Sequence, residues 1–295
     1  MEIVFLGTSC MVPTKERNHQ AIYLSYRGDG LLVDCGEGTQ RQLKKAGIKP
    51  TKISTILITH WHGDHVLGLP GLIQTLNALD YQQTLKIYGP VNSKKYFNHM
   101  FQAFSFKINF EYRIQEIKND VVTLKNLVIK SRELKHSVPC LGFQVAEKDR
   151  RRIKQKVINQ LGIPEGPLLG KLQNNEKIKW KNKIIKPEDV TYLVKGKKIT
   201  IILDTLPCEN ASRLANNADI LIAEAVYSNS LLNKAEENMH LSALQAAQLA
   251  SSSSVKKLII THFSQRYKST KPLLDEAKMV FSNTRASFDL MKVKV

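Results

Sequence analysis

A chain of 295 residues, of which 42% are apolar and 24% charged, has the composition of a globular protein with one large domain or two modest ones. It has no apolar run of the roughly 18 residues that a membrane-spanning helix needs, and MEIVFLG has neither the basic region nor the long apolar region of a signal peptide. We therefore expect a cytoplasmic protein with no membrane partner. The net charge of +18 favours a polyanionic partner, above all nucleic acid, although an ordinary lysine-rich surface gives the same charge.

The first half of the chain alternates predicted strands and helices. Glycines and turn residues bound the apolar segments, and the segments at 21–28 and 30–36 are close enough to form a hairpin. The β-branched run at 53–59 is typical of a strand buried on both faces. Strands are expected at 1–7, 21–28, 30–36, 53–59 and 84–90, and helices at 38–47 and 69–79.

The second half repeats this alternation, which indicates the α/β class. Strands are expected at 198–205, 217–228 and 255–262, and a helix at 240–253 that His240 opens. Residues 147–186 interrupt the pattern with 12 basic and four acidic residues, which is +8 of the total +18. We interpret this segment as an insertion that projects from the core. The alternatives are a long solvated loop and a packed part of the core.

The four cysteines, Cys10, Cys35, Cys140 and Cys208, are scattered and form no C-x-x-C pair. Their spacing indicates neither a zinc ribbon nor a thioredoxin-type motif. In a reducing compartment we expect them to be small buried side chains.

The densest chemical signal is THWHGDHVLG at 59–68, in which His60, His62, Asp64 and His65 form the pattern H-x-H-x-D-H. A solvated loop could carry such a cluster by accident. Imidazole and carboxylate groups on a loop after a strand are also the ligands of two-metal hydrolytic sites. His60 and His62 can share one metal while Asp64 and His65 turn toward a second. One loop cannot complete two coordination shells, so further ligands must come from elsewhere.

Three candidate ligands, His136, Asp204 and His262, lie where other strands end. This is the edge at which α/β proteins place their chemistry. Glu224 and His240 lie near the same edge and are not needed as ligands. A carboxylate that orients a protonated histidine forms a general acid. The alternative for His240 is a solvent-facing histidine at the start of a helix.

The motifs THWHGDH, HSVP, LDT and ITH, in this order, resemble those of the metallo-β-lactamase superfamily. FLGTSCMVPTKERN, VDCGEGTQRQL, GIPEGPLLGKL, AEAVYS with HLSALQAAQLA, and LIITHFSQRY are similar to the short form of the tRNase Z (ribonuclease Z) family over almost the whole chain. The resemblance implies one α/β domain over 1–295, an αββα sandwich of the metallo-β-lactamase type. It also implies that 147–186 is an inserted flexible basic arm that binds tRNA.

The resemblance further implies two zinc ions per chain. It assigns one zinc to His60, His62 and His136, the other to Asp64, His65 and His262, and the bridging position to Asp204. A water activated by the zincs and aligned by Asp64 would attack the phosphorus. His240, steered by Glu224, would protonate the leaving 3′-oxygen.

The implied enzyme is a zinc-dependent endoribonuclease that removes the 3′ trailer from precursor tRNA. It cuts after the discriminator nucleotide and leaves a 3′-hydroxyl on the tRNA and a 5′-phosphate on the trailer. The implied partners are precursor tRNA and a second copy of the chain in a homodimer. PTKERN at 13–18 is expected near the scissile end, and Ser264 and Arg266 near acceptor phosphates.

Two stretches depart from the family's usual pattern. Residues 223–226 read AEAV where the family usually has His-Glu-Ala-Thr, so Ala223 and Val226 replace a histidine and a threonine. Residues 203–206 read LDTL where it usually has Gly-Asp-Thr-Arg, so Leu203 and Leu206 are the differing residues. The metal ligand and the glutamate remain, so we expect intact chemistry and a weakened phosphate contact.

Two other classes of function stay open from the sequence. Another metallo-β-lactamase-fold phosphodiesterase or hydrolase could act on a small substrate and would not need the basic segment. A non-catalytic RNA-binding protein could use the same scaffold, but the candidate ligands would then have no role. About two zinc ions per purified chain would favour an enzyme.

Overall fold

The computed structural model describes all 295 residues and divides the chain into two compact units. The larger, here called the core unit, comprises Met1–Val145 and Lys198–Val295. The smaller, the inserted unit, comprises Ala146–Lys197. Each unit has its own cluster of buried apolar side chains. No helix in either unit has the length and apolar character needed to cross a membrane.

The first sheet of the core unit has seven strands in the order β20-β1-β3-β4-β5-β6-β7. Its strands are β1 (Glu2–Gly7), β3 (Ala21–Tyr26), β4 (Asp29–Val33), β5 (Ile53–Leu57), β6 (Leu85–Gly89), β7 (Tyr112–Glu116) and β20 (Lys292–Lys294). β3 and β4 form the antiparallel hairpin that the sequence predicts. β4 to β7 run parallel, so their C-terminal ends lie along one edge of the sheet.

The second sheet also has seven strands, in the order β19-β17-β16-β15-β10-β9-β8. Its strands are β8 (Val121–Thr123), β9 (Leu127–Leu134), β10 (Cys140–Glu147), β15 (Lys198–Ile202), β16 (Ile220–Glu224), β17 (Leu258–Thr261) and β19 (Thr284–Ala286). β15, β16, β17 and β19 are parallel neighbours. Residues that follow these strands therefore meet at one edge of the second sheet.

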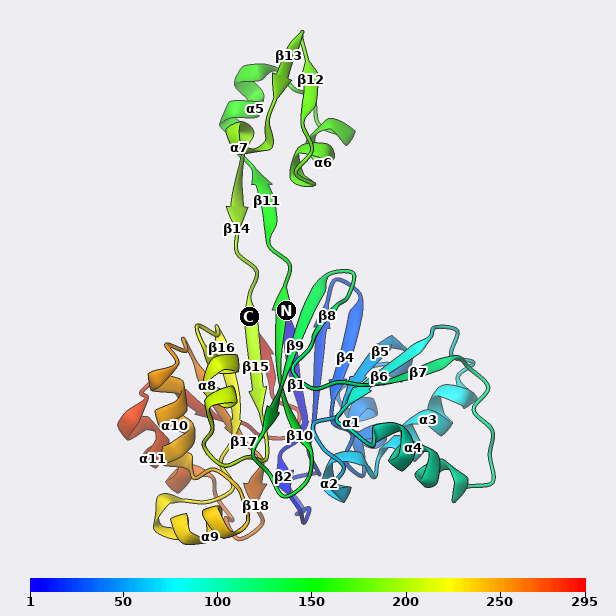
Figure 1. Ribbon diagram of the computed structural model, residues 1–295, viewed down its shortest axis with the longest axis vertical. Coiled ribbons are helices and arrows are strands. Elements are labelled where there is room, and N and C mark those ends of the chain that lie inside the picture. Colours follow the sequence, from blue (N-terminus) through cyan, green and yellow to red (C-terminus); the bar gives the residue numbers. More distant parts are fainter. The chain divides into compact units, whose positions relative to one another are not determined.

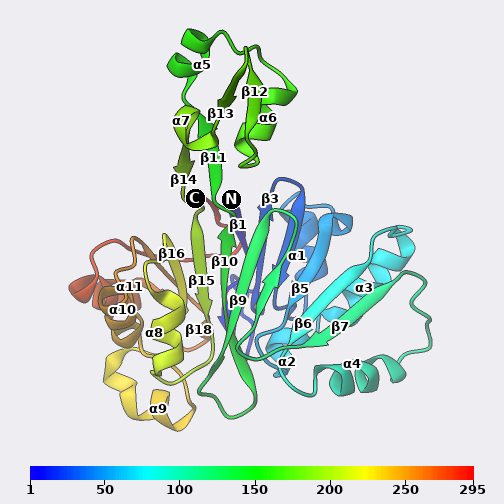
Figure 2. The same cartoon turned by 45° about the horizontal axis from the view of Figure 1, so that its top comes forward.

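Helices cover the outer face of each sheet, as Figures 1 and 2 show. α1 (Thr39–Lys45), α3 (Leu69–Ala78) and α4 (Ser93–Gln102) lie on the first sheet, and their apolar residues share one buried cluster with its strands. α8 (Glu209–Ala215), α10 (Ala243–Ser252) and α11 (Lys271–Val280) lie on the second sheet. Four buried alanines form the inner face of α10, so this helix can pack closely.

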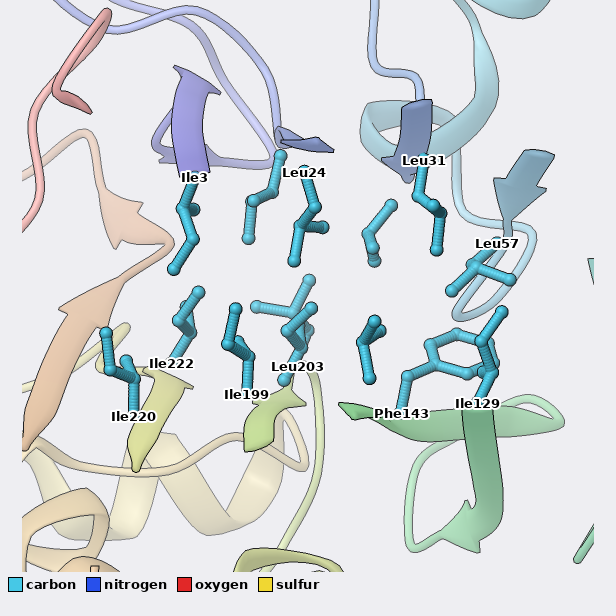
Figure 3. Packing of buried hydrophobic residues seen from close by; sticks show 14 of the residues in the cluster. Ile3, Leu24, Leu31, Leu57, Ile129, Phe143, Ile199, Leu203, Ile220 and Ile222 are labelled. Atoms are coloured by element: carbon cyan, nitrogen blue, oxygen red, sulfur yellow. The ribbon is translucent and has the colours of Figure 1, made fainter. Parts of the chain in front are cut away.

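The inner faces of the two sheets pack against each other through apolar side chains (Figure 3). The first sheet contributes Ile3, Leu24, Leu31 and Leu57. They face side chains of the second sheet, namely Ile129, Phe143, Ile199, Ile220 and Ile222, and Leu203, which directly follows β15. Burying each such side chain contributes roughly 1.5–3 kcal/mol. The layers helix, sheet, sheet, helix confirm the expected αββα sandwich.

The inserted unit has a small fold of its own. β11 (Arg150–Ile153) pairs with β14 (Thr191–Val194), and β12 (Ile178–Trp180) forms a hairpin with β13 (Lys183–Ile185). The three helices are α5 (Gln155–Leu161), α6 (Pro167–Gln173) and α7 (Pro187–Val190). The apolar face of α5 packs within this unit, in a cluster that includes Ile158 and Leu172. The unit extends beyond the expected 186 because β14 pairs with β11.

Most expected elements are present, and two details differ. The helix expected from His240 begins at Ala243, because Ser242 caps it: the Ser242 hydroxyl accepts from Gln245 N, and the Gln245 side chain accepts from Ser242 N. His240 therefore lies on the chain before the helix. A two-stranded parallel sheet of β2 (Ser9–Cys10) and β18 (Phe263–Ser264) is also present and was not expected.

Candidate metal centre

In the H-x-H-x-D-H motif, His60 and His62 lie on the segment between β5 and α2 (Gly63–Val66), and Asp64 and His65 lie in α2 itself. β5 is buried between two parallel neighbours, and the chain leaves it directly before the motif. His60 and His65 are completely buried, and Asp64 is nearly so. The segment after β5 and the short helix α2 together bring all four motif side chains to the C-terminal edge of the first sheet.

The other three candidates follow strands of the second sheet. His136 follows β9, Asp204 follows β15 and His262 follows β17. Asp204 and His262 have positive φ values of 26° and 59°. Residues with a Cβ rarely adopt this backbone region, and such strain is characteristic of functional sites.

The Asp204 carboxylate lies at the centre of the histidines. Its Oδ1 is 3.1 Å from His262 Nε2 and 3.5 Å from His65 Nε2. Its Oδ2 is 3.7 Å from His60 Nε2 and 3.9 Å from His136 Nε2. The two oxygens of one carboxylate therefore face two different sets of imidazoles, as a bridging metal ligand would.

Potential ligand atoms form overlapping groups whose members lie within 4.8 Å of one another. The groups are His60, His62, His136 and Asp204; His65, Asp204 and His262; and Cys10, Asp64 and His262. All seven expected ligands are thus brought together, and a cysteine joins them.

Several of these atoms have no hydrogen-bond partner although they are buried. They are Nε2 of His60, Nε2 of His65, both ring nitrogens of His262 and Oδ1 of Asp204. Each buried polar atom without a partner costs about 1–3 kcal/mol. Imidazole and carboxylate donors suit divalent metal ions, so the residues fit a metal centre.

The charged groups of the cluster shift one another's pKa values. Burial lowers the pKa of His60 well below its usual 6.5, and the nearby His65 lowers it further. Burial opposes ionisation of Asp204, yet His262 and His65 hold the pKa of this carboxyl well below its usual 3.8. Burial also opposes the charge on His65, but Asp204 and Asp64 raise its pKa to about 9. The carboxylates of the cluster therefore favour positive charge within it.

Glu224 and His240 form a pair beside this cluster. Glu224 is the last residue of β16 and is completely buried. Its Oε2 lies 2.8 Å from His240 Nδ1, and its Oε1 accepts a hydrogen bond from Thr205 N at 2.7 Å. Burial disfavours a charged His240, but Glu224 and Asp204 raise the pKa of the ring above 6.5. The side chain is only 12% exposed, which contradicts a solvent-facing histidine. Because Nδ1 faces Glu224, Nε2 is the nitrogen available to a substrate.

A cavity of about 280 Å³ opens onto the centre. His62, Asp64, His136, Asp204 and His240 all contribute to its wall. Another cavity of about 280 Å³, between α8 and α10, contains none of the expected ligands. The first cavity therefore combines access with the chemistry that the sequence predicts.

Two further residues shape the centre and were missed in the sequence. Asp34, buried at the end of β4, accepts from the N–H and hydroxyl of Thr59 at 2.8 Å each and lies 2.7 Å from His65 Nδ1. The Met11 N–H donates to Asp64 Oδ2 at 2.8 Å. Asp34 could have been found as a carboxylate at a strand end in VDCGEGTQ. Met11 could not, because it acts through its backbone.

The residues expected near the RNA lie beside this centre. In PTKERN, Arg17 Nη2 donates to Tyr267 O at 2.7 Å, which ties the loop to the segment after β17. Ser264 is buried in β18, and Arg266 Nε donates to its hydroxyl at 2.9 Å. Their contact with acceptor phosphates stays a prediction.

Comparison with known proteins agrees with this geometry. Residues 1–128 match the family model described as Anti-Pycsar protein Apyc1. The chain is 40% identical over 297 residues to the ribonuclease Z of Methanothermobacter thermautotrophicus, covering 100% of this chain and 97% of the relative. The crystal structure of human tRNase Z, short form, has a TM-score of 0.74 at 28% identity and covers 100% of this chain and 99% of that one. The metallo-β-lactamase fold protein YhfI from Bacillus subtilis has a TM-score of 0.72 at 18% identity over 99% of this chain and 98% of that one, a likeness of fold alone. The chain belongs to the ribonuclease Z family.

Proposed function

We propose that the chain is an endoribonuclease that removes the 3′ trailer from precursor tRNA. Hydrolysis follows the discriminator nucleotide and leaves a 3′-hydroxyl on the tRNA and a 5′-phosphate on the trailer. The observation that carries the proposal is the histidine cluster around Asp204, in a chain 40% identical over its whole length to a ribonuclease Z. Family membership supports the substrate, and the cluster supplies a means of hydrolysis.

Two zinc ions are the proposed cofactors. His60, His62 and His136 would hold one, Asp64, His65 and His262 the other, and Asp204 would bridge them. Zinc suits imidazole and carboxylate ligands and keeps positions open for water and substrate. When bound, the ions supply Lewis-acid chemistry, that is, polarisation of the phosphate and activation of the attacking water.

The chain's own residues align the reactants and supply the proton. Asp64, held by the Met11 N–H at 2.8 Å, orients the attacking water in line with the phosphorus. His240 gives a proton from Nε2 to the leaving 3′-oxygen while Nδ1 stays hydrogen-bonded to Glu224. The Thr205 N–H holds the other Glu224 oxygen, so the carboxylate keeps the ring in place. A positioned general acid is worth roughly 10²–10⁴-fold in rate.

The inserted unit is the proposed tRNA-gripping arm. Residues 146–197 carry 14 lysines and arginines against six acidic residues, +8 of the chain's +18. Such a charge binds RNA through its phosphates without reading sequence. We also propose a homodimer, as the family resemblance implies.

The test is incubation of the zinc-loaded protein with a 3′-extended precursor tRNA, with both product ends mapped. We expect a 3′-hydroxyl on the tRNA and a 5′-phosphate on the trailer. His62→Ala and Asp204→Ala should abolish cleavage and lower the zinc content. The exposed controls His99→Ala and Asp275→Ala should preserve both. Hydrolysis of a small phosphodiester with no cleavage of precursor tRNA would favour the small-substrate hydrolase instead.

A further inference from the structure

Cys10 lies in the wall of the metal cavity, and the proposed reaction gives it no role. The sequence suggests only a small buried side chain, and the residue is indeed buried. Its sulfur, an Asp64 carboxylate oxygen and a ring nitrogen of His262 all lie within 4.8 Å of one another. Three donor atoms at this spacing can share one ion.

The fold fixes Cys10 beside His262. β2 pairs in parallel with β18, so that Ser9 lies opposite Phe263 and Cys10 opposite Ser264. Phe263 N also donates a hydrogen bond of 2.8 Å to the carbonyl oxygen of Thr8, the residue before β2. The short sheet therefore joins two segments from opposite ends of the chain directly after the buried His262.

The fold also fixes Cys10 beside Asp64. Directly after Cys10 the chain turns at Met11, whose φ is 57°. This turn directs the Met11 N–H to Asp64 Oδ2 at 2.8 Å. Cys10 is thus held between two proposed ligands of the same ion and cannot move away without breaking these contacts.

Buried atoms without partners provide independent support for an ion at this place. His262 is completely buried, and neither of its ring nitrogens has a hydrogen-bond partner. The charged group closest to His262 Nε2 is Asp204, whose Oδ1 lies 3.1 Å away but makes no hydrogen bond of normal geometry with it. Cys10 also belongs to a buried cluster with Val226, Tyr227 and Ala235.

We propose that Cys10 is an additional ligand, through its sulfur, of the metal ion held by Asp64, His65 and His262. This inference rests on the proposed two-metal site. On binding, the S–H bond breaks, the sulfur electron pair forms the bond to the metal, and the proton goes to bulk water. Thiolate is a soft ligand, so this position favours zinc over manganese or magnesium more strongly than the position of His60, His62 and His136 does.

Cobalt substitution tests this directly. The protein is stripped with a chelator and reloaded with Co²⁺. Visible d–d bands then report metal in the cluster, and a near-ultraviolet sulfur-to-cobalt charge-transfer band reports a thiolate ligand. We expect both in the native chain, and only the d–d bands in Cys10→Ser and Cys10→Ala, two variants checked for folding by circular dichroism.

Two other cysteines provide matched controls. Cys140 Sγ donates to Asp204 O at 3.4 Å and is the other thiol beside the cluster, whereas Cys208 lies in the cavity between α8 and α10. Cys140→Ala and Cys208→Ser should keep the charge-transfer band. X-ray absorption of the zinc-loaded native chain should show sulfur at about 2.3 Å, and that of Cys10→Ser should not. Loss of the sulfur should weaken one of the two metals by at least about 10-fold.

The outcomes separate the proposals. Native d–d bands without a charge-transfer band, or a band that persists in Cys10→Ser, would overturn the role of Cys10 and leave the metal centre intact. Absence of both bands in the native chain would overturn the metal centre itself.

Discussion

Replacing Asp34 by asparagine is expected to weaken metal binding although Asp34 is not a proposed ligand. Its carboxylate accepts from the Thr59 N–H and hydroxyl at 2.8 Å each and lies 2.7 Å from His65 Nδ1. A nitrogen this close to a carboxylate carries a proton, so Nε2 is left to bind metal. Asparagine offers one oxygen, and its NH₂ group must face at least one of these buried donors.

The magnitude follows from these contacts. One buried donor left unsatisfied costs about 1–3 kcal/mol of the free energy of unfolding. Loss of a carboxylate that orients a ligating histidine typically costs about 10–100-fold in metal affinity. We therefore expect Asp34→Asn to lower the stability of the metal-free protein by about 1–3 kcal/mol and the affinity for the metal at His65 by about 10–100-fold.

Two measurements distinguish these effects. Competition with a chromophoric chelator gives the metal affinity, and urea unfolding in excess chelator gives the stability of the metal-free chain. Asp29→Asn is the control, because Asp29 begins the same strand and accepts from Asn126 Nδ2 at 3.0 Å. It should leave metal affinity unchanged. If Asp34→Asn loses stability but binds metal as tightly as the native chain, Asp34 supports only Thr59 and our account of His65 is wrong.

Three further predictions follow from the same structure. His240→Ala should retain its zinc and lose about 10²–10⁴-fold in cleavage rate, and Glu224→Ala should also lower the cleavage rate. Loss of zinc from a folded His240 variant would instead make His240 a metal ligand. Glu147 N donates to Lys197 O at 2.9 Å, so the ends of the insertion are close enough for a short Gly-Ser linker to replace residues 149–196. In this variant, hydrolysis of a small phosphodiester should persist, while precursor-tRNA binding should weaken and become less salt-dependent. An equal loss of both activities would contradict a tRNA-binding role of the inserted unit. Burial raises the pKa of Asp289 from 3.8 to about 6, so the stability that Asp289 contributes is fully present below pH 3.8 and is lost as the pH rises through 6. The difference in unfolding free energy between the native chain and Asp289→Asn should therefore fall by at most about 3 kcal/mol between these two pH values. A difference that stays constant with pH would refute this prediction.

The sequence predicts the local part of this architecture well. Apolar periodicity locates the strands of both sheets, and the H-x-H-x-D-H motif locates half of the centre, because both depend on residues close together in the chain. The remaining ligands could be proposed because parallel strands bring their C-terminal ends to one edge. This rule places Asp204 and His262 without any knowledge of their partners.

Contacts between distant segments could not be predicted in this way. The pairing of β2 with β18 involves only two residues on each side, too few for a periodic pattern. It is nevertheless the pairing that places Cys10 beside His262. The inserted unit ends at Lys197 rather than at 186, because β14 finds its partner in β11 across the whole insertion. Such pairings depend on the assembled fold and not on local composition.

None of the four residues that depart from the family's usual pattern lines the metal cavity. Leu203 is buried between the two sheets, Ala223 lies in the apolar cluster beneath α10, and Val226 is also buried. None of these lines the cavity, so none should alter hydrolysis of a small phosphodiester. Leu206 differs from them because it lines the separate cavity between α8 and α10, where the family's usual arginine would add a charge.

Restoring that charge should affect RNA binding and leave the chemistry unchanged. One added phosphate contact steepens the dependence of log affinity on log salt by about one unit. We expect Leu206→Arg to tighten precursor-tRNA binding at low salt, to steepen this slope by about one, and to leave turnover of a small phosphodiester unchanged. Leu206→Gln, a long uncharged side chain, is the matched control and should keep the native slope. An equal slope for the arginine and glutamine variants would mean that the bound RNA does not reach this position. The missing arginine would then have no bearing on how firmly the chain holds its substrate.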